Sequence, residues 1–481
     1  MTKPDYDWWV QHAHTDSACL QLITDHDTFK DRVLIRAAKV GRTDLTTLVN
    51  HCSYRALFEQ DRFGSMETIL DDIRPLKAPA VGRALDSPIG LAGKCLADNQ
   101  GAFYGLGLSV FWAPWAVRHD PGLLENTAAW AQSCGMNYIR WMGAHNWSGG
   151  TDPTIPGYFD LMHETIDRVA SYGLRSQITL FTRRTMIDNP VAMVKEWAKV
   201  VNAHRDQVCL VEIANEWEHA HNGWSDEMIQ DLGRCFRERS GVPLALSAPA
   251  QVTWEAMETR LKELYDGQSV PARTIHFPRR QDTAEGNWRW VRQPWHSRGM
   301  GGFIVDNEHQ KWEKSLGGRQ VDHAASACAT ALLTGCGMTA HHDNYGVLNT
   351  EGTYYDDARA DQFERVFAAM HEFLPNDLPN WTATRVGGAW NGPPHPFPRL
   401  VEQDWTAGAP RGVSRSYAAL DGSSDDFVMT LTGVRDHVTL YEPHAVPYTV
   451  LSLRDGQEVY TGRGPVTLHE HTASAYLVGT V

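Results

Sequence analysis

Two glutamates, Glu216 and Glu308, each stand close behind a short apolar run of the kind that forms a buried β-strand. Two facing carboxylates can hydrolyse an acetal, because one protonates the leaving oxygen while the other stabilises or captures the oxocarbenium-like carbon. A separation of about 5–5.5 Å suits direct attack by the second carboxylate, and one of about 6.5–9.5 Å leaves room for a water. Alternation along a strand places Glu212 on the same face as Glu216, and Asp306 on the same face as Glu308. Glu212 and Asp306 would lie deeper in the barrel than the other two, where we expect them to support the site through hydrogen bonds.

The histidines allow a different chemistry. Imidazole and carboxylate groups bind zinc and related metals, so His276, His309, His341, His342 and Asp343 could together hold a catalytic metal. Metal-dependent barrel hydrolases often carry a His-x-His pair on their first strand, whereas the corresponding run here ends in Val-Phe-Trp. A metal-dependent hydrolase is therefore the second enzymatic interpretation, while the two-carboxylate interpretation needs no metal and no cofactor.

Short apolar runs alternate with amphipathic helical patterns from about residue 101 onward. Eight strands, each followed by a mostly helical connection, are typical of an α/β fold of the (β/α)8 TIM-barrel type. An open doubly wound sheet is disfavoured because no glycine-rich phosphate turn is present. The predicted strands are residues 103–112, 137–142, 175–181, 208–214, 243–247, 273–277, 302–306 and 337–341. The predicted helices are residues 123–134, 158–172, 190–204, 226–239, 254–265, 322–334 and 358–373.

The active-site side chains of such a barrel lie where its strands end and the following loops begin. Glu216 ends the fourth predicted strand and Glu308 the seventh, which places them at the same mouth and makes them the catalytic candidates. Other polar residues at strand ends are expected to bind the substrate, namely Arg140, His145, Asn215, His276, His341 and Tyr345.

The composition changes on both sides of the predicted barrel. We assign residues 1–95 to an N-terminal extension of unknown role, 96–378 to the barrel and 379–481 to a C-terminal domain. After a proline-rich loop, the last region alternates apolar and polar residues over 426–431, 437–441, 448–453 and 475–478, with Asp-Gly turns between some of these runs. This pattern predicts a small antiparallel β-sandwich.

The run Glu-Ile-Ala-Asn215-Glu216, the run Gly-Met-Asn-Tyr-Ile-Arg140 and the glutamate after the seventh strand resemble the clan A glycoside hydrolases. These are retaining barrel enzymes that include the cellulase-like family five. The resemblance spans residues 101–374 and implies Glu216 as acid/base and Glu308 as nucleophile. It also implies that Asn215 binds a sugar hydroxyl and that Arg140 keeps the nucleophile ionised, as an adjacent cation does.

The resemblance has two further consequences for the mouth of the barrel. His276 matches a position where the clan often has a His or Tyr near the nucleophile. The eighth strand departs from the family-five pattern, because it ends in His-His-Asp where a tryptophan usually serves as sugar platform.

Tryptophan is unusually frequent, with 18 residues against 15 tyrosines and 15 phenylalanines. Many of these tryptophans fall in the loops that follow the predicted strands. Because the apolar face of a sugar stacks on aromatic rings, we expect Trp112, Trp141 and Trp217 to contribute to a carbohydrate-binding cleft.

The charge balance restricts the partners of the chain. Its 481 residues carry a formal net charge of −14, which disfavours binding to nucleic acid or to an anionic membrane. No apolar run reaches the roughly 20 residues that a bilayer requires, and the start lacks the features of a secretory signal. We therefore expect a cytoplasmic protein as encoded, with phage association or release by lysis as alternatives. A carbohydrate is the expected partner, and no oligomeric state is indicated.

The eight cysteines are scattered without metal-ligand spacing, so most are expected to be buried small side chains. A third interpretation is not enzymatic: a carbohydrate-binding or phage structural protein that keeps the barrel without turnover.

Overall fold

The structure is a computed structural model that describes most of the chain after residue 83. The described residues are 84–250, 253–277, 291, 293–308, 320–386, 400–404, 416–420, 427–431, 437–440, 447–469 and 475–480. The predicted extension over residues 1–95 therefore lies mostly outside the described residues, as do His309, Trp288, Trp290 and Trp312.

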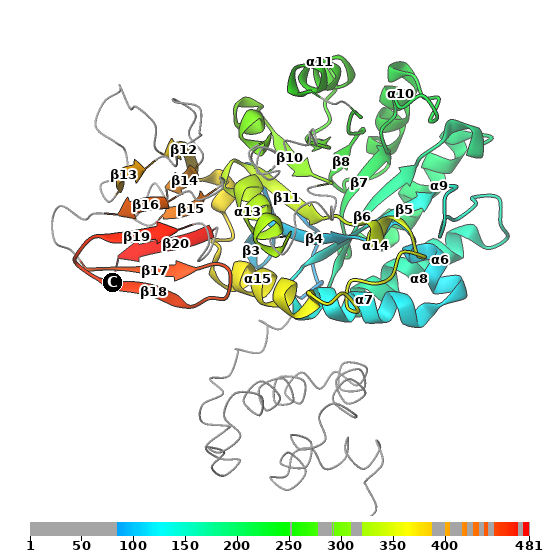
Figure 1. The fold of residues 1–481 in the computed structure, drawn as a ribbon. Coiled ribbons are helices and arrows are strands. Elements are labelled where there is room, and N and C mark those ends of the chain that lie inside the picture. The colour runs from blue at the N-terminus through cyan, green and yellow to red at the C-terminus, as the bar shows by residue number, and fades with distance from the viewer. Residues whose placement is uncertain are drawn as a thin grey trace, which may run out of the picture. The chain divides into compact units, whose positions relative to one another are not determined.

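Eight parallel strands close into a barrel, as the sequence predicted (Figure 1). The strands are buried along nearly their whole length, because helices cover the outside and side chains fill the inside. In order around the barrel they are β4 (Gly105–Ser109), β5 (Tyr138–Ala144), β6 (Arg175–Phe181), β7 (Val208–Ala214), β8 (Leu244–Ala245), β9 (Ala272–Ile275), β10 (Phe303–Asp306) and β11 (Cys336–His341).

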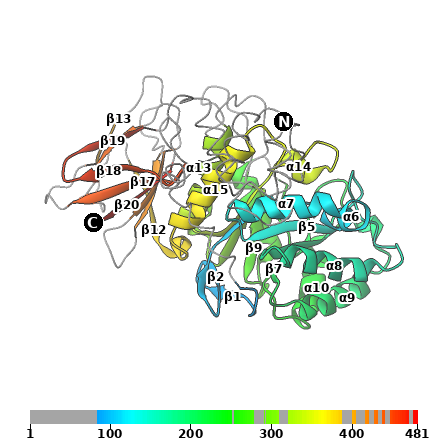
Figure 2. The same ribbon diagram turned by 90° about the horizontal axis from the view of Figure 1, so that it is seen from below.

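The helices around the barrel begin at clear sequence signals. Asn189, Ser225 and Thr253 each cap a helix by accepting a hydrogen bond from a backbone N–H in its first turn. Figure 2 shows α8, α9 and α10 side by side on the outside of the barrel. The predicted helices are found as α7 (Pro121–Ser133), α8 (Tyr158–Ala170), α9 (Pro190–Ala203), α10 (Asp226–Arg237), α11 (Trp254–Tyr265), α13 (Gln320–Leu333) and α15 (Ala360–Phe373). The sequence did not predict α6 (Ala113–His119), α14 (Asn344–Val347) or the short 3-10 helices η1 (Arg184–Met186), η3 (Gln293–Gly299) and η5 (Leu378–Asn380).

A small antiparallel sheet precedes the barrel and was not predicted. It consists of β1 (Gly90–Ala92), β2 (Cys95–Asp98) and β3 (Gly101–Phe103). Leu96 and Phe103 belong to the same apolar cluster as Tyr138 inside the barrel. The fully buried Arg175, the first residue of β6, pairs with the equally buried Asp98 at 3.0 Å. The sheet therefore closes the end of the barrel at which the strands begin.

Two antiparallel sheets follow the barrel, in agreement with the predicted β-sandwich. Apolar side chains from both sheets, among them Met429, Leu440, Leu468 and Val478, form one cluster. The first sheet has the order β12 (Thr382–Val386), β14 (Ser416–Leu420), β15 (Phe427–Leu431), β20 (Ala475–Thr480), β17 (Tyr448–Ser452) and β18 (Glu458–Gly462). The second has the order β13 (Leu400–Asp404), β16 (His437–Leu440) and β19 (Val466–His469).

The sandwich packs on the barrel through α13. Val428 of β15 belongs to the core cluster of the barrel, and the hydroxyls of Thr330 in α13 and Thr430 in β15 lie 3.1 Å apart. Within the described part of the chain, none of the helices combines the length and apolar character needed to cross a bilayer.

Most of the described cysteines are small buried side chains, as predicted. Only Cys235 is partly accessible, and burial raises the pKa of the Cys209 thiol to about 12.

Candidate active site

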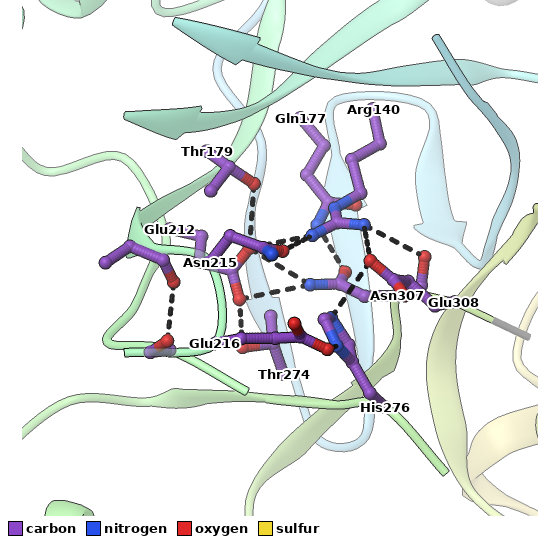
Figure 3. A network of polar contacts seen from close by, with 12 residues as sticks. Arg140, Gln177, Thr179, Glu212, Asn215, Glu216, Thr274, His276, Asn307 and Glu308 are labelled. Carbon is purple, nitrogen blue, oxygen red and sulfur yellow. Dashed lines mark hydrogen bonds and ion pairs between the residues drawn. The ribbon is translucent and has the colours of Figure 1, made fainter. Parts of the chain in front are cut away.

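The guanidinium of Arg140 lies at the centre of a polar network inside the barrel (Figure 3). Its Nη1 donates to Oε1 of Glu308 at 3.1 Å, and its Nη2 contacts Oε2 of Glu212 at 3.3 Å. Nη2 also donates to the amide oxygen of Asn215 at 2.9 Å. Burial by itself lowers the pKa of Arg140, but the two carboxylates outweigh burial and leave that pKa above its ordinary value. The arginine is therefore a fixed positive charge facing two carboxylates.

Glu212 supports this arrangement from the inner face of β7. Its carboxylate accepts hydrogen bonds from the hydroxyl of Thr179 at 2.7 Å and from the hydroxyl of Thr274. The amide nitrogen of Asn307 approaches both oxygens of Glu212, at 3.1 and 3.2 Å. These partners all donate, so both oxygens of Glu212 are held by hydrogen bonds. The expected supporting role of Glu212 agrees with this geometry, whereas Asn307 takes the position expected for Asp306.

Glu308 follows β10 and faces the cation directly. Its side chain is 7% exposed and accepts the hydrogen bond of Arg140 on Oε1. Nε2 of His276 lies 3.6 Å from the same oxygen, and Nε2 of His342 lies 3.7 Å from Oε2. The buried charge of Arg140 therefore faces the carboxylate of Glu308 directly.

Glu216 follows β7 and lies on the opposite side of His276 from Glu308. Its side chain is 25% exposed, and its Oε1 lies 3.1 Å from Nδ1 of His276. One carboxylate oxygen of Glu216, one of Glu308 and a ring nitrogen of His276 all lie within 4.8 Å of one another. Glu216 thus reaches solvent, whereas Glu308 is almost completely buried. The more exposed position suits a group that gives up and regains a proton.

The backbone of Glu216 is strained. Its φ of +44° is the one left-handed value among the non-glycine residues that the structure describes. Such a conformation costs on the order of 1–3 kcal/mol and persists where the surrounding structure enforces it, which happens most often at functional sites.

The ring of Phe111 packs against Arg140 and His342, next to Glu308. The guanidinium of Arg140 lies over the ring of Phe111 at 5.0 Å, and the ring of His342 lies 5.4 Å from that of Phe111. The half-buried Trp147 contacts Phe111 edge-on at 6.3 Å. An aromatic cluster of His342, Phe111 and Trp147 therefore extends from Glu308 toward the loop after β5, and Trp147 is its half-exposed member.

Five of the expected site residues meet in this network: Arg140, Asn215, Glu216, His276 and Glu308. They come from β5, β7, β9 and β10, whose carboxyl ends lie at one mouth of the barrel.

Trp112, Trp141 and Trp217 were expected to contribute to the carbohydrate-binding cleft, and this expectation is wrong. Each of these side chains is at most 1% exposed. The indole N–H of Trp112 donates to the backbone oxygen of Tyr345 at 2.7 Å, and that of Trp217 donates to Asp226 at 2.7 Å. Trp141 follows the inward-facing Arg140 and so points outward, with its ring 6.2 Å from that of Trp197 in α9. These rings pack the structure and have no face free for a sugar.

The expectation for His341 is also corrected. Met338 and Ala340 belong to the cluster inside the barrel, so strand alternation directs His341 outward. Its ring lies 5.0 and 5.2 Å from those of Phe363 and Phe367 in α15. The neighbouring His342 occupies the inner face in its place.

His145 and Tyr345 lie one layer behind the network. Nε2 of the buried His145 donates to the backbone oxygen of Phe111 at 3.2 Å, and its ring lies 4.3 Å from that of Trp147. The hydroxyl of Tyr345 donates to Asp357 at 2.9 Å. The contacts of His145 hold Phe111 and Trp147 in place.

Sequence reasoning missed most of the supporting polar residues. Thr179 and Thr274 are ordinary strand residues and Asn307 follows β10, and only their shared contact with Glu212 identifies them. The inward position of Arg140 could have predicted which of its neighbours face inward, because every second residue along a strand lies on the same face. The same parity argument rejects Trp141.

The predicted histidine metal cluster does not form as a unit. His341 points away, and His309 is outside the described residues. The described residues offer a different set of potential ligands, namely Glu216, His276 and Glu308.

The chain resembles known proteins in fold rather than in sequence. No protein-family model and no curated protein matches it. A Bacteroides vulgatus protein assigned as a glycoside hydrolase is 12% identical, with a TM-score of 0.52 over 82% of each chain. A GH30 endoxylanase from Clostridium papyrosolvens is 11% identical, with a TM-score of 0.46 over 82% of this chain and 98% of its own.

A β-1,4-mannanase from the sea hare Aplysia kurodai is 12% identical, with a TM-score of 0.43 over 60% of this chain and 98% of its own. The first of these three likenesses establishes a common fold, and the activity has to be argued from the site.

Proposed function

We propose that the protein is a retaining glycoside hydrolase that acts on an oligo- or polysaccharide. The observation that carries this proposal is the close approach of Glu216 and Glu308, whose nearest oxygens lie within 4.8 Å with His276 between the two residues. Retaining enzymes keep their carboxyl groups about 5–5.5 Å apart, whereas inverting enzymes need about 6.5–9.5 Å. The spacing supports retention.

The environments of the two carboxylates assign their roles. Glu308, paired with Arg140, attacks the anomeric carbon, and the bond from that carbon to the leaving oxygen breaks. The leaving oxygen takes the proton of Glu216. Glu216 then removes a proton from a water whose oxygen attacks the anomeric carbon, and the carboxylate of Glu308 leaves. The half-exposed ring of Trp147 offers an apolar surface for the sugar.

The test is a reducing-end release screen over diverse polysaccharides and aryl glycosides. Glu216→Gln is expected to lose about 10²–10⁴-fold in turnover of unactivated substrates, because a glutamine cannot transfer the proton. Glu308→Gln is expected to lose turnover entirely, since no nucleophile remains. Glu216→Gln should unfold at the same denaturant concentration as the parent within a small margin. Glu308→Gln loses its charge pair with Arg140, so it should unfold at a lower denaturant concentration but remain folded under the assay conditions.

Glu255→Gln, an exposed change on α11, serves as the matched control and should retain full activity. Full activity in either Glu216→Gln or Glu308→Gln would overturn the assignment. The anomeric configuration of the first product, read by NMR, tests retention. Sugar binding without hydrolysis across the whole panel would favour a binding protein instead.

A metal-dependent hydrolase is the second candidate, because two carboxylates and an imidazole lie within 4.8 Å of one another. The two candidates differ after exhaustive chelation, which should leave a two-carboxylate enzyme fully active. Activity that disappears with the chelator and returns with a stoichiometric metal ion would favour the second candidate.

A further inference from the structure

Glu216 needs a device that holds its backbone in place. The left-handed φ of +44° at a residue with a side chain relaxes unless neighbouring groups fix the flanking peptides. A change in this backbone would turn the carboxyl group away from His276, which it contacts at 3.1 Å.

The buried side chain of Asn222 contacts this part of the backbone. Its Nδ2 donates to the carbonyl oxygen of Asn215 at 3.0 Å and to that of Glu216 at 2.8 Å. These two carbonyls belong to the peptides on either side of the strained Cα. One amide group therefore fixes the orientation of both peptides at once.

Asn222 is itself held firmly. Its N–H donates to the backbone oxygen of His219 at 2.8 Å, and its own carbonyl accepts a hydrogen bond from the N–H of Arg184 at 2.7 Å. The hydroxyl of Ser247 binds the other side of the bend by accepting from the N–H of Trp217 at 3.3 Å. The loops after β6, β7 and β8 thus share in fixing one backbone conformation.

We infer that Asn222 is a positioning residue that fixes the strained backbone of Glu216 and so aims its proton at the leaving oxygen. The inference rests on the proposed function, in which Glu216 is the acid/base. Asn222 acts through Glu216, because its described contacts are with the backbone and none is with Glu308. A misplacement of about 1 Å in a catalytic group can lower the rate about 10²-fold.

The kinetic test compares two glycosides of the sugar that the parent enzyme hydrolyses best. A methyl glycoside needs protonation of its leaving oxygen, whereas a 2,4-dinitrophenyl glycoside does not. For Asn222→Ala we expect kcat/KM to fall about 10–100-fold on the methyl glycoside and by less than about threefold on the dinitrophenyl glycoside. Slower proton removal from water should also lower kcat and KM together on the dinitrophenyl glycoside.

Two further variants sharpen the comparison. Asn222→Asp has the same shape but cannot donate to either carbonyl, so it should show the same selective loss. Asn202→Ala removes an equivalent amide-to-carbonyl hydrogen bond, from Asn202 to the oxygen of Arg239 at 2.7 Å, at an exposed site on α9. It should leave both rates unchanged. Equal losses on both glycosides in Asn222→Ala would indicate general damage to the fold and overturn the inference.

A crystal structure of Asn222→Ala tests the same inference without any substrate. We expect the φ of Glu216 to relax to a negative value and its contact with His276 to be lost. An unchanged left-handed φ would overturn the positioning role even if the variant were inactive. An inactive parent enzyme with a relaxed Glu216 in the variant would instead count against the proposed function alone.

Discussion

Arg140 is a single buried cation shared by two carboxylates. Its guanidinium contacts Glu308 at 3.1 Å and Glu212 at 3.3 Å, and its side chain is fully buried. Removing one member of a buried ion pair leaves an uncompensated charge, which is more costly than the pair itself is favourable. The residue therefore stabilises the fold and also sets the ionisation of the proposed nucleophile.

We predict that Arg140→Met lowers the free energy of unfolding by about 3–5 kcal/mol, because Glu212 and Glu308 lose their common partner. Chemical denaturation measures the change. Arg168→Met is the control, since Arg168 pairs with Glu125 and Glu164 at the surface. That variant should lose no more than about 1 kcal/mol. Equal stability of Arg140→Met and the parent would contradict the prediction.

Residue positions were predictable from sequence where parity and strand position agree. Arg140 lies within β5, and Glu216 and Glu308 each follow a clear strand by two residues, so their positions follow from counting along the chain. His341 and His342 have the same chemistry and adjacent positions, and choosing between them requires knowing which residues of β11 face inward. Asn222 lies in a loop, where no periodicity constrains its side chain.

At the scale of elements, His145 joins two loops at the mouth of the barrel. It follows β5 and donates from Nε2 to the carbonyl of Phe111, which lies beyond β4. Burial lowers the pKa of His145 to about 4. Protonation would place an N–H on the buried Nδ1, which has no hydrogen-bond partner in the described structure. The joint between the two loops therefore depends on a neutral imidazole.

We predict that stability falls as the pH drops from about 6.5 to about 4. In this range the unfolded His145 binds a proton and the folded one does not, so acid favours unfolding. Complete protonation should cost on the order of 3 kcal/mol. His145→Gln cannot titrate and should reduce the difference in unfolding free energy between pH 7.5 and pH 4.5. The exposed His119→Gln should not, and identical pH dependence in the parent and His145→Gln would refute the prediction.

The elements themselves differ in how far the sequence predicted them. All eight barrel strands were predicted to within a few residues, because each is a buried apolar run and seven of the eight are followed by a helical pattern. β1 to β3 have three or four residues each, too few to show a period. In the C-terminal domain, β15, β16, β17 and β20 were predicted, whereas the remaining strands are short runs with mixed polarity.

At the scale of the whole molecule, the two ends of the barrel hold separate buried charge pairs. The buried pair of Arg175 and Asp98 closes the end where the strands begin, whereas Glu216 and Glu308 lie where they finish. Changes at the first end should therefore affect folding without altering the chemistry.

We predict that Asp98→Asn lowers the free energy of unfolding by about 3–5 kcal/mol, since Arg175 then remains buried without its counter-charge. At 25 °C the folded fraction should keep the kcat of the parent. Asp231→Asn removes a surface pair with Arg234 on α10 and should change neither quantity. A fall in kcat for Asp98→Asn, measured per folded molecule, would show that the two ends are coupled.

The contacts of Arg140 also have a consequence for folding during synthesis on the ribosome. They join β5 to side chains that follow β7 and β10, and neither strand is a neighbour of β5 in the barrel. Glu308 is synthesised 168 residues after Arg140, so this contact cannot form earlier. No half-barrel made early in synthesis holds the complete charge network. A fragment that ends before Glu308, through premature termination or proteolysis, should therefore lack the proposed activity.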